Sequence, residues 1–319
     1  MAQQGERENK AFSEAVSQWF LAWSLVKSKV YKLPVTRAVD FVFFDSLDVY
    51  STSILTVPGG ELITGPPFMN SPLTWRKMLH HDSLLLPDSQ VVPISLISFA
   101  GQLKSGKSFF VMPLPSFWKS AGVKSKELGL ENLITGVFLH EFSHTQQMQN
   151  FGKRITLLEN ASHFDKDFTD DLVQVIFEKD SSYKKNYEEE KDMFYNVFFS
   201  GEKKIRTRLI VSALKKMHQR QQKYFTGKYI RLREIDDFFL TMEGVGQFSM
   251  YAWLVHPEGA NISSGVALKG VRRGGRWWSQ EEGLALILAL STLNSPKEWG
   301  KLMFGETVIT ARKLIESCY

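Results

Sequence analysis

The spacing of apolar residues changes along the chain and predicts helices in some segments and strands in others. Over residues 11–30 the apolar side chains recur at helical spacing, for example at Phe12, Val16 and Phe20. Leu33-Pro34 follows, and a proline disfavours the helical conformation at the residue that precedes it. The pattern therefore predicts an amphipathic helix that ends before Pro34.

A β-rich region comes next, in which Pro- and Gly-rich turns separate dense runs of β-branched and aromatic residues. These runs predict strands of a small mixed sheet at residues 38–44, 50–57, 91–100 and 108–114. The last run contains Pro113, which suits a strand at the edge of a sheet. We expect that edge strand to pair with an extended peptide.

Helical patterns dominate after Lys124. An apolar stripe runs from Leu130 into the sequence HEFSH, and Asn150-Phe151-Gly152 supplies a stop signal. Ser279, with Glu282 three residues on, predicts the N-cap of another helix. Beyond the HEFSH helix, the patterns predict helical structure at residues 165–199, 205–224, 230–255, 277–293 and 304–317.

Strands first and helices after predict an α+β fold. The N-terminal lobe, residues 1–152, would contain the sheet and end with the HEFSH helix. Residues 153–319 would form a mainly helical lobe, and the two lobes would work as one unit.

The stretch GQLKSGKS at residues 101–108 matches the phosphate-binding pattern G-x-x-x-x-G-K-[ST]. Such a loop requires a helix after it, because the helix N-terminus helps to surround the phosphates. After Ser108 the chain reads FFVMPLPSFW, and a proline inside a helix costs about 3 kcal/mol. Gly106 is therefore predicted as the turn residue of a hairpin. A P-loop nucleotide-binding protein, acting through Gly101–Ser108, is kept as a remote alternative.

The sequence HEFSH matches the zinc-binding pattern H-E-x-x-H. On a helix, positions i and i+4 lie on one face, so His140 and His144 can direct two imidazole nitrogens at one ion. Glu141 lies about 100° around the helix from His140, where it can reach a water molecule on that ion. The pattern predicts a Zn²⁺ site with Glu141 as general base.

HEFSH resembles the active helix of the zincin metallopeptidases, and the order of elements also resembles theirs. The resemblance is specific over about ten residues and architectural elsewhere. It implies a zincin-like fold and a zinc-dependent hydrolase that acts on a peptide or protein substrate.

The third zinc ligand is expected further along the chain, because Gln147 and Asn150 stand where the metzincin extension would place Gly and His. Resemblance to gluzincins, which use a Glu on a later helix, favours Glu243, with His163 as the rival. Gly244 and Gly246 would let the helix of Glu243 press against the HEFSH helix. Gln247, one turn beyond Glu243, would accept a hydrogen bond from a ligand histidine.

The sequence offers candidates for stabilising the oxyanion, and it leaves one main alternative to catalysis. The candidate donors to the oxyanion of the reaction are Tyr251, His256 and Arg273, and the sequence does not choose among them. The main alternative is a zincin-like binding or scaffold protein without catalysis. Glu141 argues against it, because a purely structural metal site needs no base.

The amino-acid composition limits the classes of protein to which the chain can belong. The hydrophobic content of 43% supports a globular core, and the net charge of +5 is too small to indicate nucleic-acid binding. The single cysteine, Cys318, excludes an intrachain disulfide. No apolar run is long enough to span a membrane, and no signal peptide is evident. The chain is therefore expected in the cytoplasm, with a secretory signal trimmed before Ala2-Gln3 as the alternative.

Overall fold

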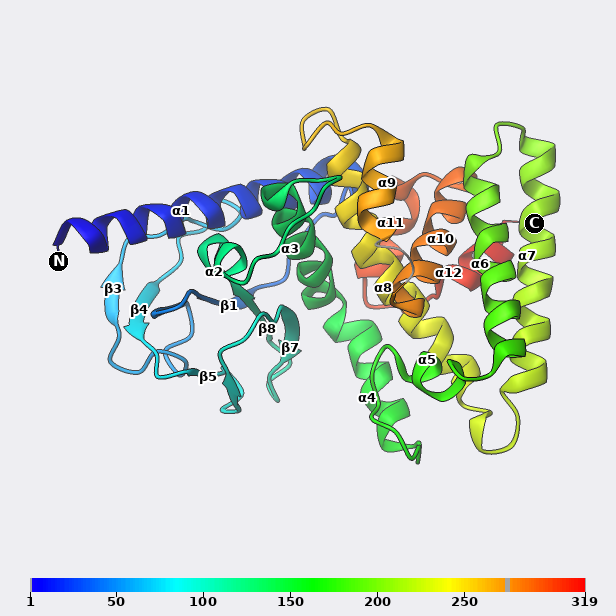
Figure 1. Cartoon of the computed structure of the whole chain (residues 1–319), viewed down its shortest axis with the longest axis horizontal. Helices are drawn as coiled ribbons and strands as arrows, with labels where there is room; N and C mark the ends of the chain where they lie inside the picture. Colours follow the sequence, from blue (N-terminus) through cyan, green and yellow to red (C-terminus); the bar gives the residue numbers. More distant parts are fainter. Residues whose placement is uncertain (1, 273–275, 319) are drawn as a thin grey trace. The chain divides into compact units, whose positions relative to one another are not determined.

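The computed structural model describes residues 2–272 and 276–318. For residues 2–8 it describes the backbone alone. The chain divides into two compact units, and Figure 1 labels most of their helices and strands. The first unit comprises Met1–Met148 and Ser249–Gly270, and the second comprises Gln149–Phe248 and Val271–Tyr319. Strands come first and helices after, so the predicted α+β class is confirmed. The division into lobes 1–152 and 153–319 stays a prediction.

The first unit is built on a six-stranded mixed sheet. Its central strands β1 and β8 run parallel, with Val39 opposite Ser108, and every other neighbouring pair is antiparallel. All residues of these two strands are buried, which explains why their sequences are almost continuously apolar. The strand order is β3 (Glu61–Ile63), β4 (Trp75–Leu79), β2 (Asp48–Ser51), β1 (Val39–Phe44), β8 (Ser108–Pro113) and β7 (Phe99–Gln102).

Helices cover one face of this sheet. They are α1 (Ala2–Leu25), which continues as a π-helical turn over Val26–Tyr31, and α3 (Leu130–Gln147). Phe142 of α3 stacks on Phe41 of β1 with ring centroids 5.9 Å apart. The opposite face packs on the small sheet of β5 (Ser83–Leu85) and β6 (Val91–Pro93). The short helix α2 (Pro115–Ser120) follows β8.

Three strand predictions need correction. The strand expected at 50–57 ends at Ser51, and the one expected at 91–100 is divided between β6 and β7. The strand expected at the sheet edge, β8, lies inside the sheet between β1 and β7. Pro113 is tolerated there because it is the last residue of the strand, where a missing N–H costs little pairing.

The predicted stop at residues 150–152 is also wrong, because α3 passes through a π-helical turn at Met148–Gly152 into α4 (Lys153–Asn160). The side chain of Asn150 is used inside the second unit instead. Its amide donates to the carbonyl oxygens of Met303 and Gly305, at 3.3 and 2.7 Å.

The second unit is helical throughout its described secondary structure. The helix predicted at 304–317 is confirmed only from Ala311 to Glu316, because Phe304 ends the preceding helix. The helices after α4 are α5 (Leu172–Phe177), α6 (Ser181–Phe199), α7 (Lys203–Tyr224), α8 (Leu232–Val255, of which residues from Ser249 on belong to the first unit), α10 (Trp278–Leu293), α11 (Pro296–Phe304) and α12 (Ala311–Glu316). Helix α9 (Ser264–Arg272) belongs to the first unit up to Gly270.

Helices α8 and α10 approach each other at two glycines. A Cβ atom on Gly244 would lie 2.3 Å from the carbonyl oxygen of Gly283, and one on Gly283 would lie 2.5 Å from that of Leu240. The prediction that Gly244 serves contact with the HEFSH helix is therefore wrong, because its neighbour is α10. Ser279 is likewise not an N-cap: α10 begins at Trp278 and Ser279 is buried inside it.

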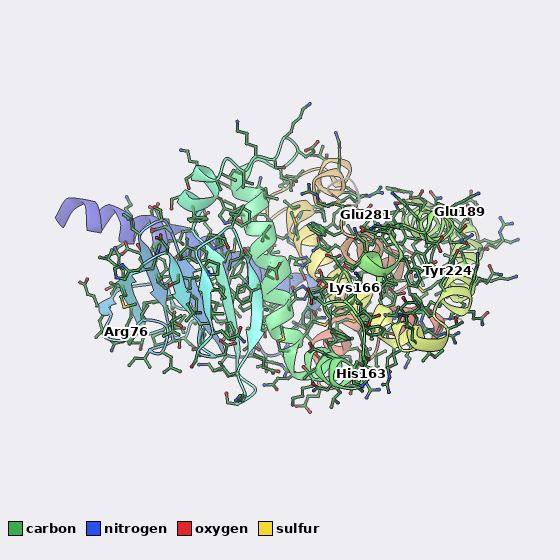
Figure 2. The ribbon with its side chains drawn as sticks, turned by 60° about the horizontal axis from the view of Figure 1, so that its bottom comes forward. Arg76, His163, Lys166, Glu189, Tyr224 and Glu281 are labelled. Atoms are coloured by element: carbon green, nitrogen blue, oxygen red, sulfur yellow. The ribbon has the colours of Figure 1, made fainter. Side chains whose placement is uncertain are left out.

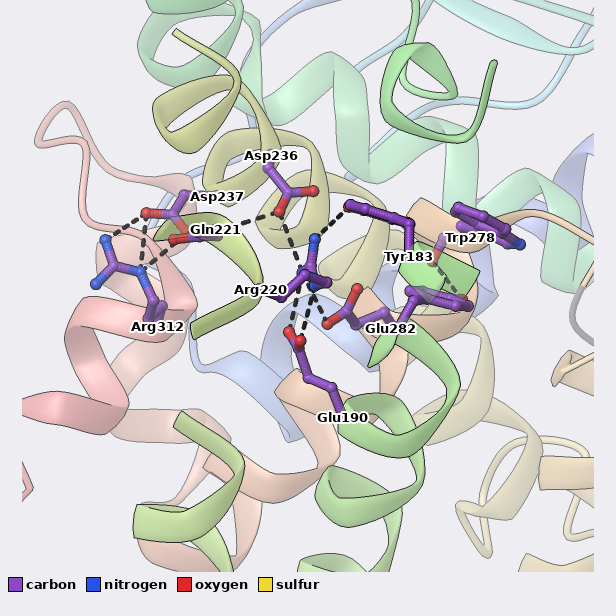
Figure 3. A network of polar contacts seen from close by, with 10 residues as sticks. Tyr183, Glu190, Arg220, Gln221, Asp236, Asp237, Trp278, Glu282 and Arg312 are labelled. Atoms are coloured by element: carbon purple, nitrogen blue, oxygen red, sulfur yellow. Dashed lines mark hydrogen bonds and ion pairs between the residues drawn. The ribbon is translucent and has the colours of Figure 1, made fainter. Parts of the chain in front are cut away.

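A buried ionic network holds α6, α7, α8 and α10 together (Figure 3). Arg220 of α7 forms a two-pronged ion pair with Glu190 of α6, at 2.7 and 2.9 Å. The same guanidinium lies 3.3 Å from Asp236 and 3.4 Å from Glu282, and it donates to the hydroxyl of Tyr183. Glu282 was expected to cap a helix, and it instead shares this arginine.

Among the described helices, none combines the length and the apolar character that crossing a bilayer would require.

Candidate metal centre

The glycine-rich segment 101–108 is part of a β-hairpin. It contains the end of β7, a turn with Gly106 at φ +88°, and the first residue of β8. Ser108 donates its hydroxyl to the carbonyl oxygen of Thr145 in α3, at 2.9 Å, and Lys107 pairs with Asp40 at 2.6 Å. The segment lacks the helix that a P-loop requires, as its sequence predicted.

Helix α3 forms where the apolar stripe predicted it. Gly129 precedes it at φ +74°, a conformation that L side chains rarely adopt, and Leu130 is the first helical residue. Phe138 and Phe142, one turn apart, are buried and fix one face of the helix against the unit's core. The following turns carry the HEFSH sequence.

His140, Glu141 and His144 lie together on α3. One potential ligand atom from each residue lies within 4.8 Å of the other two. The Nε2 atoms of His140 and His144 are 3.1 Å apart, and the rings are nearly perpendicular, at 89°. Both histidines are buried, at 5% and 6% exposure, whereas Glu141 is partly exposed. This is the arrangement predicted from the spacing of the motif.

The geometry of the two imidazoles fits a shared ion. Two nitrogens bound at about 2.0–2.1 Å in a tetrahedral site are separated by about 3.3 Å. The observed 3.1 Å is close to that value. Two imidazoles with an adjacent carboxylate are a donor set typical of zinc.

Gln147 contacts His144, and the sequence analysis missed this contact. Its Oε1 atom lies 3.4 Å from Nδ1 of His144. A proton on Nδ1 would make that contact and leave Nε2 free to bind a metal. Gln147 is fully buried. Its position three residues after His144, on the same side of the helix, was the available signal.

Helix α3 also contacts the end of α8 within the first unit. Ser143 donates its hydroxyl to that of Ser249 at 2.9 Å, and Ser249 lies 2.8 Å from the hydroxyl of Tyr31. A Cβ atom on Gly136 would lie 2.6 Å from the side chain of Met250. The glycine therefore permits close packing of α3 against the end of α8 inside the first unit.

The remaining predicted ligands belong to the second unit. Glu243 is buried on α8, and its assignment as third ligand stays a prediction. Gln247 donates its amide to Oε1 of Gln280 at 2.6 Å. The rival, His163, is an exposed residue of the loop after α4 (Figure 2).

The predicted oxyanion donors are in different settings. The hydroxyl of Tyr251 lies 2.8 Å from that of Ser264, and burial raises the pKa of Tyr251. His256 accepts a hydrogen bond at Nδ1 from the backbone N–H of Glu258, at 3.1 Å. Both belong to the first unit, and their role stays a prediction. Arg273 lies outside the described residues.

No family of known proteins matches the chain, and neither a curated protein nor a solved structure is similar to it.

Proposed function

We propose that the protein is a zinc-dependent hydrolase in which His140 and His144 bind the metal and Glu141 is the general base. The observation that carries this proposal is the convergence of the two Nε2 atoms beside a partly exposed carboxylate. A site that only stabilised the fold would need no such carboxylate.

The proposed chemistry divides between the ion and the protein. His140 and His144 would hold the zinc ion, which would supply Lewis acidity and lower the pKa of a water molecule toward about 7. Glu141 takes the proton of the attacking water and passes it to the leaving group. Gln147 keeps the ring of His144 in the orientation that presents Nε2.

For the third ligand we propose Glu243. It is buried on α8, and a buried carboxylate requires a cation or hydrogen-bond donors. Burial, and then the charge of Glu243, raise the pKa of Asp171 to about 6. The two carboxylates repel each other, and a bound cation would relieve this repulsion. Gln247 is proposed to accept a hydrogen bond from a ligand histidine through Oε1, since its amide nitrogen is directed at Gln280.

A peptide bond is the substrate that we propose, on two grounds. The motif resembles that of the zincin peptidases. Strand β7, which contacts α3, pairs with β8 alone among the described strands. Its other edge offers backbone groups to which an extended peptide can add as a further strand.

The decisive experiment compares the protein with Glu141→Gln, measuring zinc content and hydrolysis of a casein-derived peptide library. We expect Glu141→Gln to retain zinc and to lose at least about a hundredfold in hydrolysis rate. Equal rates in the two proteins would rule out the catalytic role and favour a scaffold that binds metal. Zinc stoichiometry on His144→Ala and Glu243→Ala tests the ligands, with His163→Ala as the matched rival.

A further inference from the structure

A cavity lies in the first unit, away from the HEFSH motif. It has a volume of about 270 Å³ and is bounded by α1, by the first turns of α3 and by the end of α8 with the turn that follows. That volume is below the size of a typical drug-sized pocket and fits one long side chain. The lining residues are Gln18, Leu21, Ala22, Leu25, Glu131, Asn132, Thr135, Trp253, Glu258 and Gly259.

The wall after α8 is tightly folded. The N–H of Gly259 donates to the carbonyl oxygen of His256 at 2.9 Å, and the N–H of Ala260 donates to that of Trp253 at 3.2 Å. A Cβ atom on Gly259 would lie 2.2 Å from the same oxygen of Trp253. Only glycine allows this close approach, so the turn fixes the backbone on both sides of Glu258.

The lining combines an apolar body with negative charge. Leu21, Leu25 and the indole of Trp253 provide apolar surface, and Glu131 and Glu258 provide two carboxylates. None of the ten lining residues is basic. Lys29 lies outside the lining and pairs with Glu258 at 3.2 Å, so the net charge at the cavity is about one negative unit.

The hydroxyl of Thr135 adds a polar group to the wall of the cavity. Thr135 is 6% exposed and lines the cavity, and within the described part of the chain its hydroxyl has no hydrogen-bond partner. Asn132 directs its amide nitrogen to the carbonyl oxygen of Leu128 at 3.0 Å, which leaves its amide oxygen as an acceptor. A ligand in the cavity can therefore form hydrogen bonds with this hydroxyl and with this amide oxygen.

The cavity and the HEFSH motif use different faces of α3. At about 100° per residue, His140 is about 140° around the helix from Thr135 and about 180° from Glu131. A ligand in the cavity therefore does not contact the two histidines, and its binding does not depend on the proposed hydrolase activity.

We propose that this cavity binds the side-chain ammonium group of a lysine in a polypeptide partner. The ammonium donates charge-assisted hydrogen bonds to Glu131 and Glu258, and a further bond to the hydroxyl of Thr135. The aliphatic stem packs on the two leucines. The indole of Trp253 adds cation–π attraction.

The test uses n-butylammonium as the probe, with n-butanol and butyrate as matched neutral and anionic probes. Binding is followed through the indole N–H resonance of Trp253, assigned with Trp253→Phe. We expect the ammonium to bind at least about tenfold more tightly than the alcohol, and butyrate not to bind. Equal affinity for ammonium and alcohol, or no shift of the Trp253 resonance, would overturn the proposal.

Substitutions around the cavity should change the affinity for n-butylammonium in opposite directions. Glu131→Gln and Glu258→Gln should each weaken ammonium binding roughly five- to tenfold. Lys29→Ala should tighten it, because Glu258 loses a competing cation. The control Glu127→Gln, whose carboxylate pairs with Lys269, should leave affinity unchanged. Unchanged affinity in both carboxylate variants would contradict the proposal, provided that thermal unfolding shows them folded.

Two further measurements place the site. Nα-acetyl-lysine methylamide should bind as tightly as n-butylammonium if the ligand is a lysine of a polypeptide. Exclusion of this compound, with n-butylammonium still bound, would assign the pocket to a small free amine and overturn the polypeptide partner. Glu141→Gln should bind n-butylammonium with unaltered affinity, so this test stands whether or not the chain is a hydrolase.

Discussion

His144 and Gln147 are linked on one face of α3, with Nδ1 of the histidine 3.4 Å from Oε1 of the glutamine. Replacing the acceptor without changing volume, as in Gln147→Met, should lower zinc affinity about ten- to a hundredfold, because the ring orientation of His144 is no longer fixed. Gln147→Glu retains an acceptor and should retain affinity. Competition with a chromophoric chelator measures both, and Gln90→Met, at an exposed position, is the control. Equal affinity in Gln147→Met and the parent would show that the contact does not orient the ring.

Zinc should stabilise the folded chain if the two histidines bind it. A ligand that binds only the native state at a hundred times its Kd raises the free energy of unfolding by about 2.7 kcal/mol. Denaturant unfolding with and without zinc measures this gain, which His144→Ala should largely abolish. His81→Ala, at an exposed histidine, should keep it. An undiminished gain in His144→Ala would place the zinc elsewhere.

Because α8 and α10 are in close contact, adding one methyl group at this contact should strongly lower the free energy of unfolding. In Gly244→Ala the new Cβ would meet backbone atoms of Gly283 at 2.3 and 2.6 Å, which cannot move aside cheaply. We expect a loss of about 1–3 kcal/mol, which exceeds the helix-propensity gain of up to about 1 kcal/mol. Gly265→Ala in α9 is the matched control, because no atom lies within 4 Å of its added Cβ, and it should not destabilise. Denaturant unfolding distinguishes the two, and equal stability of Gly244→Ala and the parent would contradict the close approach.

Local patterns in the sequence predicted the parts of the molecule that depend on local structure. The spacing of His140 and His144, the apolar stripe before them and the two prolines after Ser108 each constrain only a few neighbouring residues. The motif helix and the hairpin followed from these constraints alone. Their confirmation required no knowledge of what packs against them.

The failures concern residues whose role is set by distant partners. Gly244 was assigned to the wrong neighbouring helix, because a glycine indicates a close approach without naming its partner. Ser279 and Glu282 matched a capping pattern, but α10 begins before them and Arg220 recruits Glu282 from another helix. Strand order likewise placed β8 inside the sheet, although its proline suggested an edge.

The carboxylates around Arg220 should make the stability of the fold depend on pH. Burial raises the pKa of Asp236 to about 6, against the lowering effect of Arg220 and with a further increase from Asp237. Burial and the charge of Glu190 also raise the pKa of Glu282 well above its usual range. One arginine thus faces more buried carboxylates than its charge can balance.

The sign of the pH effect follows from the direction of the shift. The folded state holds the proton of Asp236 at pH values where the unfolded chain, with an ordinary pKa of 3.8, has released it. The contribution of Asp236 to stability is therefore full below about pH 4 and falls as the pH rises through about 6. A shift of this size corresponds to about 3 kcal/mol at most. Urea unfolding from pH 4 to 7 should show the parent losing stability relative to Asp236→Asn, while Asp167→Asn, at an exposed position, should follow the parent. A constant difference between the parent and Asp236→Asn across this range would show that Asp236 is ionised throughout and fully balanced by Arg220.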